Sequence, residues 1–233
     1  MGKHGYQQYC ALARALDVAG DRWTLLIVRE LLPGPRRFTD LIDGLTGISR
    51  KLLTERLRDL ERDGIIARKE LPPPAARQVY QLTNDGRDLA VAMAPLIGWG
   101  LRRLGDRQPE ESFRARWPAV GMVGLADREA AKGVSETYQY LVDDSAFYFT
   151  VHDGSIQLHD GRAQDAAVVV VTDEETWADI ASGKITTSSA AAAGVVTITG
   201  HRQAWNRLRK IFSREHMLAQ ANAPVIGAGL KND

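Results

Sequence analysis

The amino-acid sequence predicts an α+β protein made of two units, and three observations carry that prediction. Residues 38–62 read as a short helix, a glycine-containing turn and a second, amphipathic helix, with a pair of short strands after them. Residues 105–112 form a polar segment that separates this half from the rest. Beyond it, strand patterns come first and helix patterns later, which is typical of an α+β layer with a mostly antiparallel sheet.

The segment 47–64 is the most informative part of the chain. Ser49 is a good N-cap residue for a helix, and Gly64 supplies a left-handed stop. Between them, Leu53, Leu57 and Leu60 fall at i, i+4 and i+7 and make one apolar face. The sequence therefore predicts a helix over residues 50–62 that buries one side.

The opposite face of this helix is polar and largely cationic. Backbone N–H groups at a helix N-terminus bind phosphate, and Ser49, Arg50 and Lys51 lie there. The outer stripe consists of Lys51, Thr54, Glu55, Arg58 and Arg62, with Arg50 on its flank. This pattern is typical of a DNA-reading helix, although a solvated face gives the same pattern.

The neighbouring segments favour the DNA-reading interpretation. An apolar helix at 23–32 ends at Pro33-Gly34-Pro35, and a short helix follows at 38–45. Strands at 65–71 and 78–82 are joined by a proline-rich loop, where prolines are tolerated because they need no ladder hydrogen bond. A helix-turn-helix followed by a β-hairpin is a winged helix, whose wing would place Arg77, with Arg68 and Lys69, along a phosphate backbone.

The same half of the chain resembles the HxlR-type bacterial transcription regulators, which are similar to MarR-type regulators. The resemblance runs from about residue 9 to 104 and rests on ordered motifs at Cys10–Leu32, Gly34–Leu41, Gly47–Ser49, Leu53–Glu61 and Tyr80–Thr83. It implies a homodimer that binds double-stranded operator DNA with an inverted repeat. It also implies that helices at 9–18 and 85–104 form the dimer interface.

From the helix, its turn and the wing, we expect a defined set of DNA-contacting residues. These are Arg36, Arg37, Thr39, Ser49, Arg50, Lys51, Thr54, Arg58 and Arg77. Net charge is only +1 over 233 residues, which is low for a DNA-binding protein. However, residues 1–110 hold 18 Lys/Arg against 14 Asp/Glu, a balance of +4, so the positive charge lies in the winged-helix half.

The second half alternates in the strand period at 134–142 and 147–151. Asp153-Gly154 and Asp160-Gly161 are hairpin signals, and residues 166–171 form a β-branched run expected of a central strand. A helix is predicted at 113–125, interrupted at Pro118. Further helices are expected after a capping box that starts at Thr172, and over residues 204–212.

This half resembles a sterol-carrier-protein-like domain over residues 113–215. The residues that carry the resemblance are Asp165–Trp177, Ser182–Ile185 and Gly194–Gly200. Such domains hold apolar ligands between sheet and helices, which implies a small apolar ligand here. The candidate ligand-binding residues are Trp117, Tyr138, Tyr140, Phe147, Phe149, Trp177 and Trp205. The alternative is that these aromatic side chains form only the core.

One cysteine in the chain excludes an intrachain disulfide framework and is typical of a cytoplasmic protein. Its position before Trp23 matches a cysteine that some members of the resembled family use as a redox sensor, so Cys10 is a redox candidate, with Arg14 one turn away. The alternative is an inert cysteine near the dimer interface.

We expect no enzymatic activity, no cofactor and no metal site. His152-Asp153 and His159-Asp160 lie at turn signals, where Asp serves the backbone, and the sequence has no nucleophile elbow or phosphate-binding loop. No run of 18 apolar residues and no signal-like N-terminus is present, so no membrane association is expected.

The domain organisation predicted from these features has four parts. Residues 1–104 form the winged helix-turn-helix and dimerisation domain, 105–112 a linker, 113–220 the ligand-binding domain and 221–233 a tail. The function predicted is a DNA-binding regulator modulated by an apolar ligand. Two alternatives remain: redox sensing through Cys10, and a winged helix that binds a protein partner instead of DNA.

Overall fold

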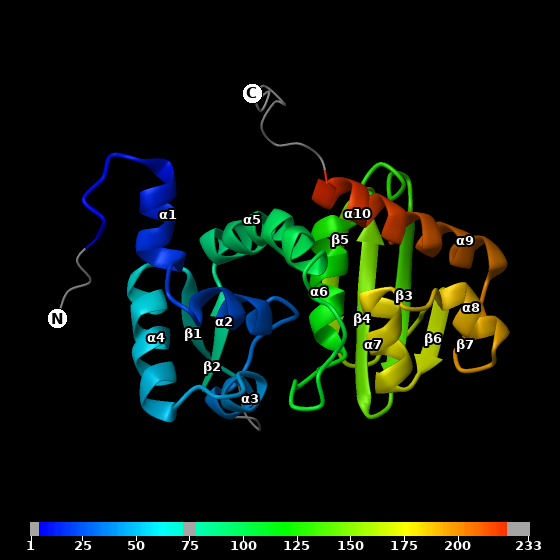
Figure 1. The fold of residues 1–233 in the computed structure, drawn as a ribbon, viewed down its shortest axis with the longest axis horizontal. Coiled ribbons are helices and arrows are strands. Elements are labelled where there is room, and N and C mark those ends of the chain that lie inside the picture. Colours follow the sequence, from blue (N-terminus) through cyan, green and yellow to red (C-terminus); the bar gives the residue numbers. More distant parts are fainter. Residues whose placement is uncertain (1–4, 72–77, 223–233) are drawn as a thin grey trace, which may run out of the picture. The chain divides into compact units, whose positions relative to one another are not determined.

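The computed structural model describes residues 5–71 and 78–222, and the chain divides into two compact units, Met1–Met93 and Ala94–Asp233 (Figure 1). Helix α5, Asn84–Leu101, begins in the first unit and ends in the second. Arg77, at the predicted tip of the wing, lies outside the described residues.

The first unit is a helix-turn-helix followed by a β-hairpin, as the sequence predicts. Its helices are α1 (Ala11–Ala19), α2 (Thr24–Leu31), α3 (Phe38–Gly44) and α4 (Arg50–Arg62). Strands β1 (Ile66–Glu70) and β2 (Gln78–Leu82) pair antiparallel, with Ile66 opposite Leu82. Arg36 adds a short antiparallel bridge to Tyr80, so the segment before α3 is fastened to the wing.

The core of the first unit forms around the leucine face of α4. Leu53, Leu57 and Leu60 are 0%, 1% and 1% exposed, and the residues around them are equally buried. The buried partners from the other elements are Ile27, Leu31, Leu41, Leu45, Ile65, Ile66 and Leu82. Burial of each such side chain stabilises the fold by roughly 1.5–3 kcal/mol, so this core fixes which side of α4 faces outward.

The start of α5 is fastened to the end of α4. The Thr83 hydroxyl donates to the Gly64 carbonyl at 2.6 Å, and the Gly86 N–H donates to the Thr83 hydroxyl at 3.1 Å. The backbones approach so closely that a Cβ on Gly86 would lie 2.1 Å from the Ile65 carbonyl oxygen. Any displacement of the first turn of α5 therefore acts directly on the C-terminal end of α4.

The second unit is a five-stranded sheet with helices. Strand order is β5-β4-β3-β6-β7, and only β3 and β6 run parallel, so the mostly antiparallel sheet is confirmed. The strands are β3 (Ser135–Val142), β4 (Ser145–His152), β5 (Ser155–Asp160), β6 (Val168–Thr172) and β7 (Thr197–Gly200). The helices are α6 (Arg116–Leu125), α7 (Glu174–Ser182), α8 (Thr187–Ala192), α9 (Arg202–Ile211) and α10 (Arg214–Asn222).

The two faces of this sheet differ in chemistry. Tyr138 pairs with Phe149 and Tyr140 with Phe147, which places four aromatic side chains on one face. Trp177 of α7 contacts Tyr140 and Phe147 on this face, as Figure 1 shows for α7 and the strands beside it. The opposite face carries polar and half-buried side chains instead, among them Thr137, Tyr148, Thr150, Gln157 and His159.

The prediction of a hairpin at Asp160-Gly161 is wrong. The turn at Asp153-Gly154 does join two neighbouring strands, because both residues have positive φ (44° and 82°), as a two-residue hairpin requires. After Gly161 the chain instead crosses to the other side of β3 and becomes β6. The buried Gln139 side chain holds this crossing, since it accepts from Ala163 N–H at 2.6 Å and donates to the Gly161 carbonyl at 3.2 Å.

Two further helix predictions need correction. The N-cap of α7 is Asp173 and not Thr172, because the Asp173 carboxylate accepts from Thr176 N–H at 2.7 Å, while Thr172 is the last residue of β6. Pro118 does not interrupt a helix: α6 begins at Arg116, and a proline in the first turn costs no helical hydrogen bond. Within the described residues, no helix has the length and apolarity needed to cross a membrane.

Candidate functional site

Helix α4 begins with the geometry of an N-terminal anion site. Its N-cap, Ser49, is extended (φ −79°, ψ 152°), and the Ser49 hydroxyl accepts from Leu52 N–H at 3.2 Å. Gly47 has φ 91°, a conformation that favours glycine, and it makes the turn from α3 possible. The sequence-predicted residues Ser49, Arg50 and Lys51 therefore lie together, exposed, at the first turn of α4.

The cations of α4 fall into two groups. Arg50, Lys51 and Arg58 are exposed and, among the described residues, form no ion pair; Arg50 lies 5.9 Å from the Phe38 ring. Arg56 and Arg62 are instead paired with carboxylates. Thr54 is exposed as well, and its hydroxyl donates to the Arg50 carbonyl at 2.8 Å. The outer stripe thus presents positive charge that no carboxylate in residues 5–71 or 78–222 pairs with.

The predicted DNA-contacting residues before and within α3 differ in their exposure. Thr39 is exposed, and Arg37, the N-cap of α3, is half-buried. Arg36 is held by its own unit, since its Nε donates to the Glu30 carbonyl at 3.2 Å and its backbone pairs with Tyr80. Arg36 is therefore positioned by the end of α2 and by the wing.

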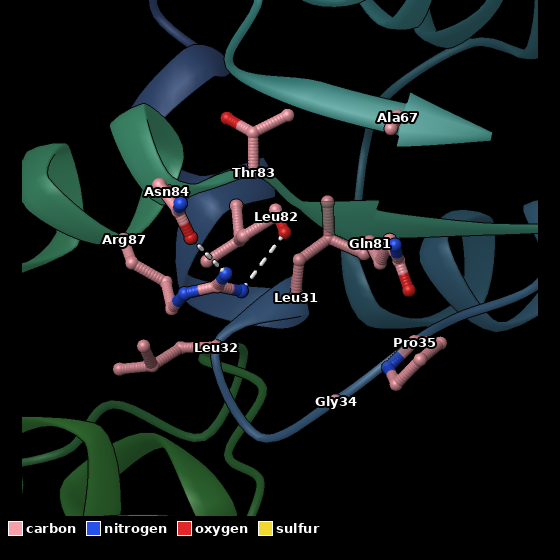
Figure 2. Close-up of a pocket in the computed structure, with 10 residues that line it drawn as sticks. All are labelled: Leu31, Leu32, Gly34, Pro35, Ala67, Gln81, Leu82, Thr83, Asn84 and Arg87. Atoms are coloured by element: carbon pink, nitrogen blue, oxygen red, sulfur yellow. Dashed lines mark hydrogen bonds between the residues drawn. The ribbon is translucent and has the colours of Figure 1, made fainter. Parts of the chain in front are cut away.

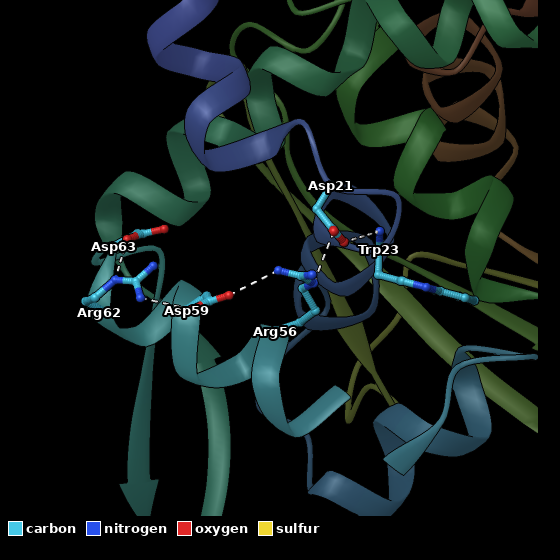
Figure 3. A network of polar contacts seen from close by, with 6 residues as sticks. All are labelled: Asp21, Trp23, Arg56, Asp59, Arg62 and Asp63. Atoms are coloured by element: carbon cyan, nitrogen blue, oxygen red, sulfur yellow. Dashed lines mark hydrogen bonds and ion pairs between the residues drawn. The ribbon is translucent and has the colours of Figure 1, made fainter. Parts of the chain in front are cut away.

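A network of ion pairs fixes α4 against the start of α2 (Figure 3). Arg56 Nε lies 3.1 Å from Asp21 Oδ2, and the other Asp21 oxygen accepts from Trp23 N–H at 3.0 Å. On the other side, Arg56 Nη1 donates to Asp59 at 3.1 Å. Asp59 in turn pairs with Arg62. Because Asp21 caps the turn before α2, this network sets the position of α4 relative to α2.

The sequence did not reveal this positioning role of Asp21 and Arg56. The pairing of Arg56 with Asp59 is visible as an i, i+3 spacing, but Asp21 is remote in the sequence. The wing is anchored similarly: Arg68 Nε lies 3.1 Å from Glu61 Oε2, and its guanidinium lies over the Tyr80 ring. Arg68, considered above as a phosphate contact, instead links β1 to α4.

An open hollow of about 480 Å³ lies between the end of α2 and the junction of β2 with α5 (Figure 2). Its lining is Leu31, Leu32, Gly34, Pro35, Ala67, Gln81, Leu82, Thr83, Asn84 and Arg87. Arg87 lies in it but is already engaged, since it donates to the Leu82 carbonyl and to the Asn84 side chain. The Arg87 guanidinium is therefore already hydrogen-bonded to the protein and is not a free cation for a ligand in this hollow.

Five of the predicted ligand-binding residues form one aromatic cluster in the second unit. The Tyr140 ring lies 5.3 Å from Phe147, 5.6 Å from Phe149 and 5.3 Å from Trp177. Tyr138 is fully buried beside them on the same face. Trp117 and Trp205 are half-buried, and the Arg209 guanidinium lies 6.0 Å from the centre of the Trp205 ring. Phe212, which the sequence reading did not select, contacts Phe149 at 4.7 Å.

The two tyrosines of the cluster differ in hydrogen bonding. Tyr138 donates to Glu136 Oε2 at 2.6 Å, and Arg207 also donates to this carboxylate. Burial raises the pKa of Glu136, but the hydrogen bonds from Arg207 and Tyr138 outweigh it and leave that pKa below its usual value. Burial, with the Glu136 hydrogen bond, raises the pKa of Tyr138. For Tyr140, burial alone raises the pKa.

The remaining candidates lie elsewhere. Cys10 is exposed at the N-cap of α1, and the nearby Arg14 forms an ion pair with Asp17 at 3.5 Å. His159 accepts or donates a hydrogen bond with the Thr150 hydroxyl at 3.0 Å and stacks on Tyr148, on the polar face of the sheet. Across the described ranges, no group of three or more His, Cys, Asp or Glu side chains could hold a metal ion.

Comparison with known proteins agrees with this geometry. The model of the HxlR-like helix-turn-helix family matches residues 18–108. The transcriptional regulator YvaP of Bacillus subtilis is 36% identical over 86 residues, which cover 37% of this chain and 80% of YvaP. The chain belongs to the HxlR family of helix-turn-helix regulators. The resemblance stated from the sequence motifs is confirmed.

Other relatives extend this picture. The regulator YodB of B. subtilis is 35% identical over 36% of this chain and 76% of YodB; the solved reduced form of YodB covers 42% of this chain with a TM-score of 0.38. The regulator Rv3095 of Mycobacterium tuberculosis is 44% identical over 39% of this chain, and the chain spans only 56% of its length.

The second half has a family of its own. The model of the SCP-2 sterol transfer family matches residues 124–213, which contain the whole five-stranded sheet and α7 to α9. The predicted combination of an HxlR-type helix-turn-helix and a sterol-carrier-protein-like domain in one chain is therefore confirmed.

Replacing Arg56 with Met should destabilise the first unit by about 1–3 kcal/mol, because Asp21 loses its ion-pair partner and Asp59 loses a charged hydrogen-bond donor while the apolar stem is kept. Chemical denaturation followed by circular dichroism measures the change. Arg62→Met serves as the control and should leave stability unchanged, since Arg62 is exposed. Adding Asp21→Asn to Arg56→Met should cost less than the sum of the two single changes; strict additivity would contradict the network.

The single substitutions Tyr138→Phe and Tyr140→Phe should have different effects on the free energy of unfolding. Tyr138→Phe removes a hydrogen bond to a carboxylate and should lower the free energy of unfolding by about 1–3 kcal/mol. Tyr140→Phe removes a hydroxyl without a partner among the described residues and should leave the free energy of unfolding unchanged or raise it. Urea titration of both variants checks this, and equal losses would show that Tyr140 has an equivalent hydrogen bond.

Proposed function

We propose that the protein is a transcriptional regulator that binds double-stranded operator DNA through α4, in the cytoplasm, with a regulatory and not an enzymatic role. The observation that carries this proposal is the charge pattern of α4. Arg50, Lys51 and Arg58 are exposed and form no ion pair within the described part of the chain, at a helix whose first N–H groups are available, whereas Arg56 is paired with Asp21 and Asp59. Phosphate is the ligand that such a surface fits.

The predicted contacts take different roles in this proposal. Ser49, Arg50 and Lys51 contact phosphates or base edges at the entrance of the major groove, and Thr54 and Arg58 lie further along the same face of α4. Arg37 and Thr39 contact the backbone from the start of α3, and Arg77 positions the wing. Arg36, held by Glu30 and Tyr80, contributes by supporting this region and by its charge.

Apolar side chains exposed on α1 and α5 support a homodimer. Leu12 and Val91 are each 65% exposed, and further large apolar side chains are exposed on or next to both helices. The exposed members are Tyr9, Leu12 and Leu16 on or next to α1, and Val91, Leu96 and Trp99 on α5. A second copy that covers these faces would place two α4 helices on an inverted-repeat operator.

In this proposal, the aromatic cluster of the second unit binds a small apolar ligand, and the ligand modulates DNA binding. Helix α7 carries Trp177, and the Trp177 indole N–H donates to the Ala115 carbonyl at 2.7 Å, at the start of α6. Two ion pairs hold residues 106–107 of the connecting segment against α7 and the residues just after it. Lys184 Nζ lies 3.3 Å from Asp106 Oδ1, and Arg107 Nη2 lies 3.7 Å from Glu174 Oε1. A ligand that displaces α7 would therefore act on residues 106–115.

From that segment the chain leads back into α5, whose first turn is fastened to the end of α4 by Thr83. An effector with unequal affinity for the DNA-competent and DNA-incompetent dimers would shift their populations through this route. The matching SCP-2 sterol transfer family supports an apolar ligand, because its name describes proteins that carry one.

The double substitution Arg50→Ala with Lys51→Ala should abolish most operator affinity, by at least tenfold, because both residues neutralise phosphate charge. The slope of log affinity against log salt concentration should also become shallower by about one to two. Fluorescence anisotropy with operator DNA at several salt concentrations measures both quantities.

The matched control is Arg202→Ala with Lys210→Ala, which removes the same charge from α9 in the second unit and should leave affinity and slope unchanged. If the α4 variant binds DNA as tightly as the unmodified protein, the assignment of α4 as recognition helix is wrong. Binding of a protein partner, lost in the same variant, would then favour the winged helix as a protein-interaction module.

Exposure of Cys10 favours a second candidate function, redox sensing. Treatment with diamide should then produce a Cys10 cross-link or sulfenate, detected by mass spectrometry, and should change operator affinity in the unmodified protein but not in Cys10→Ser. Unmodified Cys10 and unchanged DNA affinity after treatment would reject this candidate.

A further inference from the structure

Glu55 is a carboxylate in the middle of a stripe that is otherwise polar or cationic. It lies on α4 opposite the buried leucine face, and its side chain is exposed, like those of Lys51 and Arg58. A carboxylate repels phosphate, so on a surface that binds the DNA backbone Glu55 lowers the affinity unless it has a favourable contact of its own. The acidic side chain at this position therefore needs a separate explanation.

The Glu55 carboxylate forms no ion pair with any of the described residues. The other acidic residues of α4 and its C-cap are all paired with arginine: Asp59 with Arg56 and Arg62, Asp63 with Arg62, and Glu61 with Arg68. Lys51 lies four residues before Glu55 and Arg58 three residues after it, and both spacings allow ion pairs on a helix. Neither cation pairs with Glu55 within residues 5–71 and 78–222, so the carboxylate is presented to the outside.

The neighbouring hydroxyl on the stripe is already used by the helix itself. Thr54 Oγ1 donates its hydrogen to the Arg50 carbonyl at 2.8 Å. Within the described part of the chain, Glu55 then offers an acceptor and Arg58 offers donors that no ion pair uses. These two residues are about one turn apart, with Cβ atoms about 5–6 Å from each other, whereas base pairs follow each other every ~3.4 Å. Glu55 and Arg58 can therefore reach the same base pair or two adjacent ones.

The base that fits a carboxylate follows from the groups that each base presents in the major groove. Guanine and thymine present acceptors, which a carboxylate repels, and adenine places its N7 acceptor beside its N6 amino group. Cytosine presents the N4 amino group, which donates, and no acceptor beside it. Its partner guanine presents O6 and N7, which accept from an arginine. A carboxylate and an arginine side by side on one helix therefore fit a cytosine and a guanine.

We propose that Glu55 determines operator specificity by accepting a hydrogen bond from the N4 amino group of a cytosine in each half-site, while Arg58 donates to a guanine of the same or the adjacent base pair. This inference rests on the proposed function, in which α4 reads the major groove, and it names a base that the operator contains. On DNA without this cytosine the Glu55 carboxylate meets acceptors or phosphate, so the same residue disfavours incorrect sites.

The test is selection of binding sites from a random double-stranded DNA library by the full chain and its variants. We expect the unmodified protein to select a cytosine at one position of each half-site. Glu55→Ala should lose the preference at that position and keep the others, and Glu55→Gln should replace cytosine by adenine, which a glutamine amide reads through N6 and N7. The matched control is Glu215→Gln, the same change at an exposed residue of α10 in the second unit, which should select the same sequences as the unmodified protein.

Fluorescence anisotropy then measures the discrimination on two DNA duplexes, the selected operator and a copy in which T·A replaces the selected C·G pairs. The unmodified protein should bind the selected operator at least about fivefold more tightly, the lower value for one good contact to a base. Glu55→Ala should bind the two duplexes with nearly equal affinity, because it has no carboxylate to distinguish them.

Three results would overturn the inference, and they differ in what else they affect. An unchanged cytosine preference in Glu55→Ala would show that Glu55 faces only solvent, while the role of α4 in DNA binding stands. An equal loss of affinity for every sequence in Glu55→Ala would show that Glu55 positions Lys51 or Arg58 and reads no base. If the unmodified protein selects no sequence at all, sequence-specific binding fails as well, and the variant of Arg50 and Lys51 shows separately whether α4 binds DNA.

Discussion

Burial of the leucine face of α4 is the constraint on which the DNA-binding unit depends. With Leu53, Leu57 and Leu60 in the core, the opposite side of a helix must face outward, and it carries Arg50, Lys51 and Arg58. Hydrophobic burial sets only the rotation of the helix about its own axis. The ion pairs of Arg56 with Asp21 and Asp59 then fix its position relative to α2, so two different forces determine how the cations are presented.

In the second unit, too, apolar side chains fill the core and hydrogen bonds fix the positions of the segments around it. Aromatic side chains fill the space between the sheet and α7, and a few hydrogen bonds locate the surrounding segments: Trp177 to Ala115, Gln139 to Ala163 and Tyr138 to Glu136. Because one of these bonds and one ion pair join α7 to residues 106–115, and Lys184, just after α7, forms a second ion pair with Asp106, the helix that covers the cluster also holds the connecting segment. In the proposed function, these contacts are the route by which a ligand in the cluster would change the geometry of that segment.

Local sequence signals predicted most elements of both units. The N-cap at Ser49, the glycine stop at Gly64 and the Asp153-Gly154 hairpin depend on the conformational preferences of single residues, so they can be read without knowing the fold. The Asp160-Gly161 signal failed because strand order decides whether a turn joins neighbours, and β5 is an edge strand whose chain must cross to β6. The cap at Asp173 was missed because Thr172 is an equally good capping residue and only the extent of β6 separates the two.

The sequence by itself determined the family, the two kinds of domain and the cationic stripe of α4, because these rest on residue type and periodicity along one segment. Only the tertiary structure decided which charges are free. Arg56 and Arg58 are two positions apart on one helix, yet Arg56 meets Asp21 from another element and Arg58 meets no described partner. Tyr138 and Tyr140 differ in the same way, because a hydrogen-bond partner is a property of position in space and not of neighbouring residues in the chain.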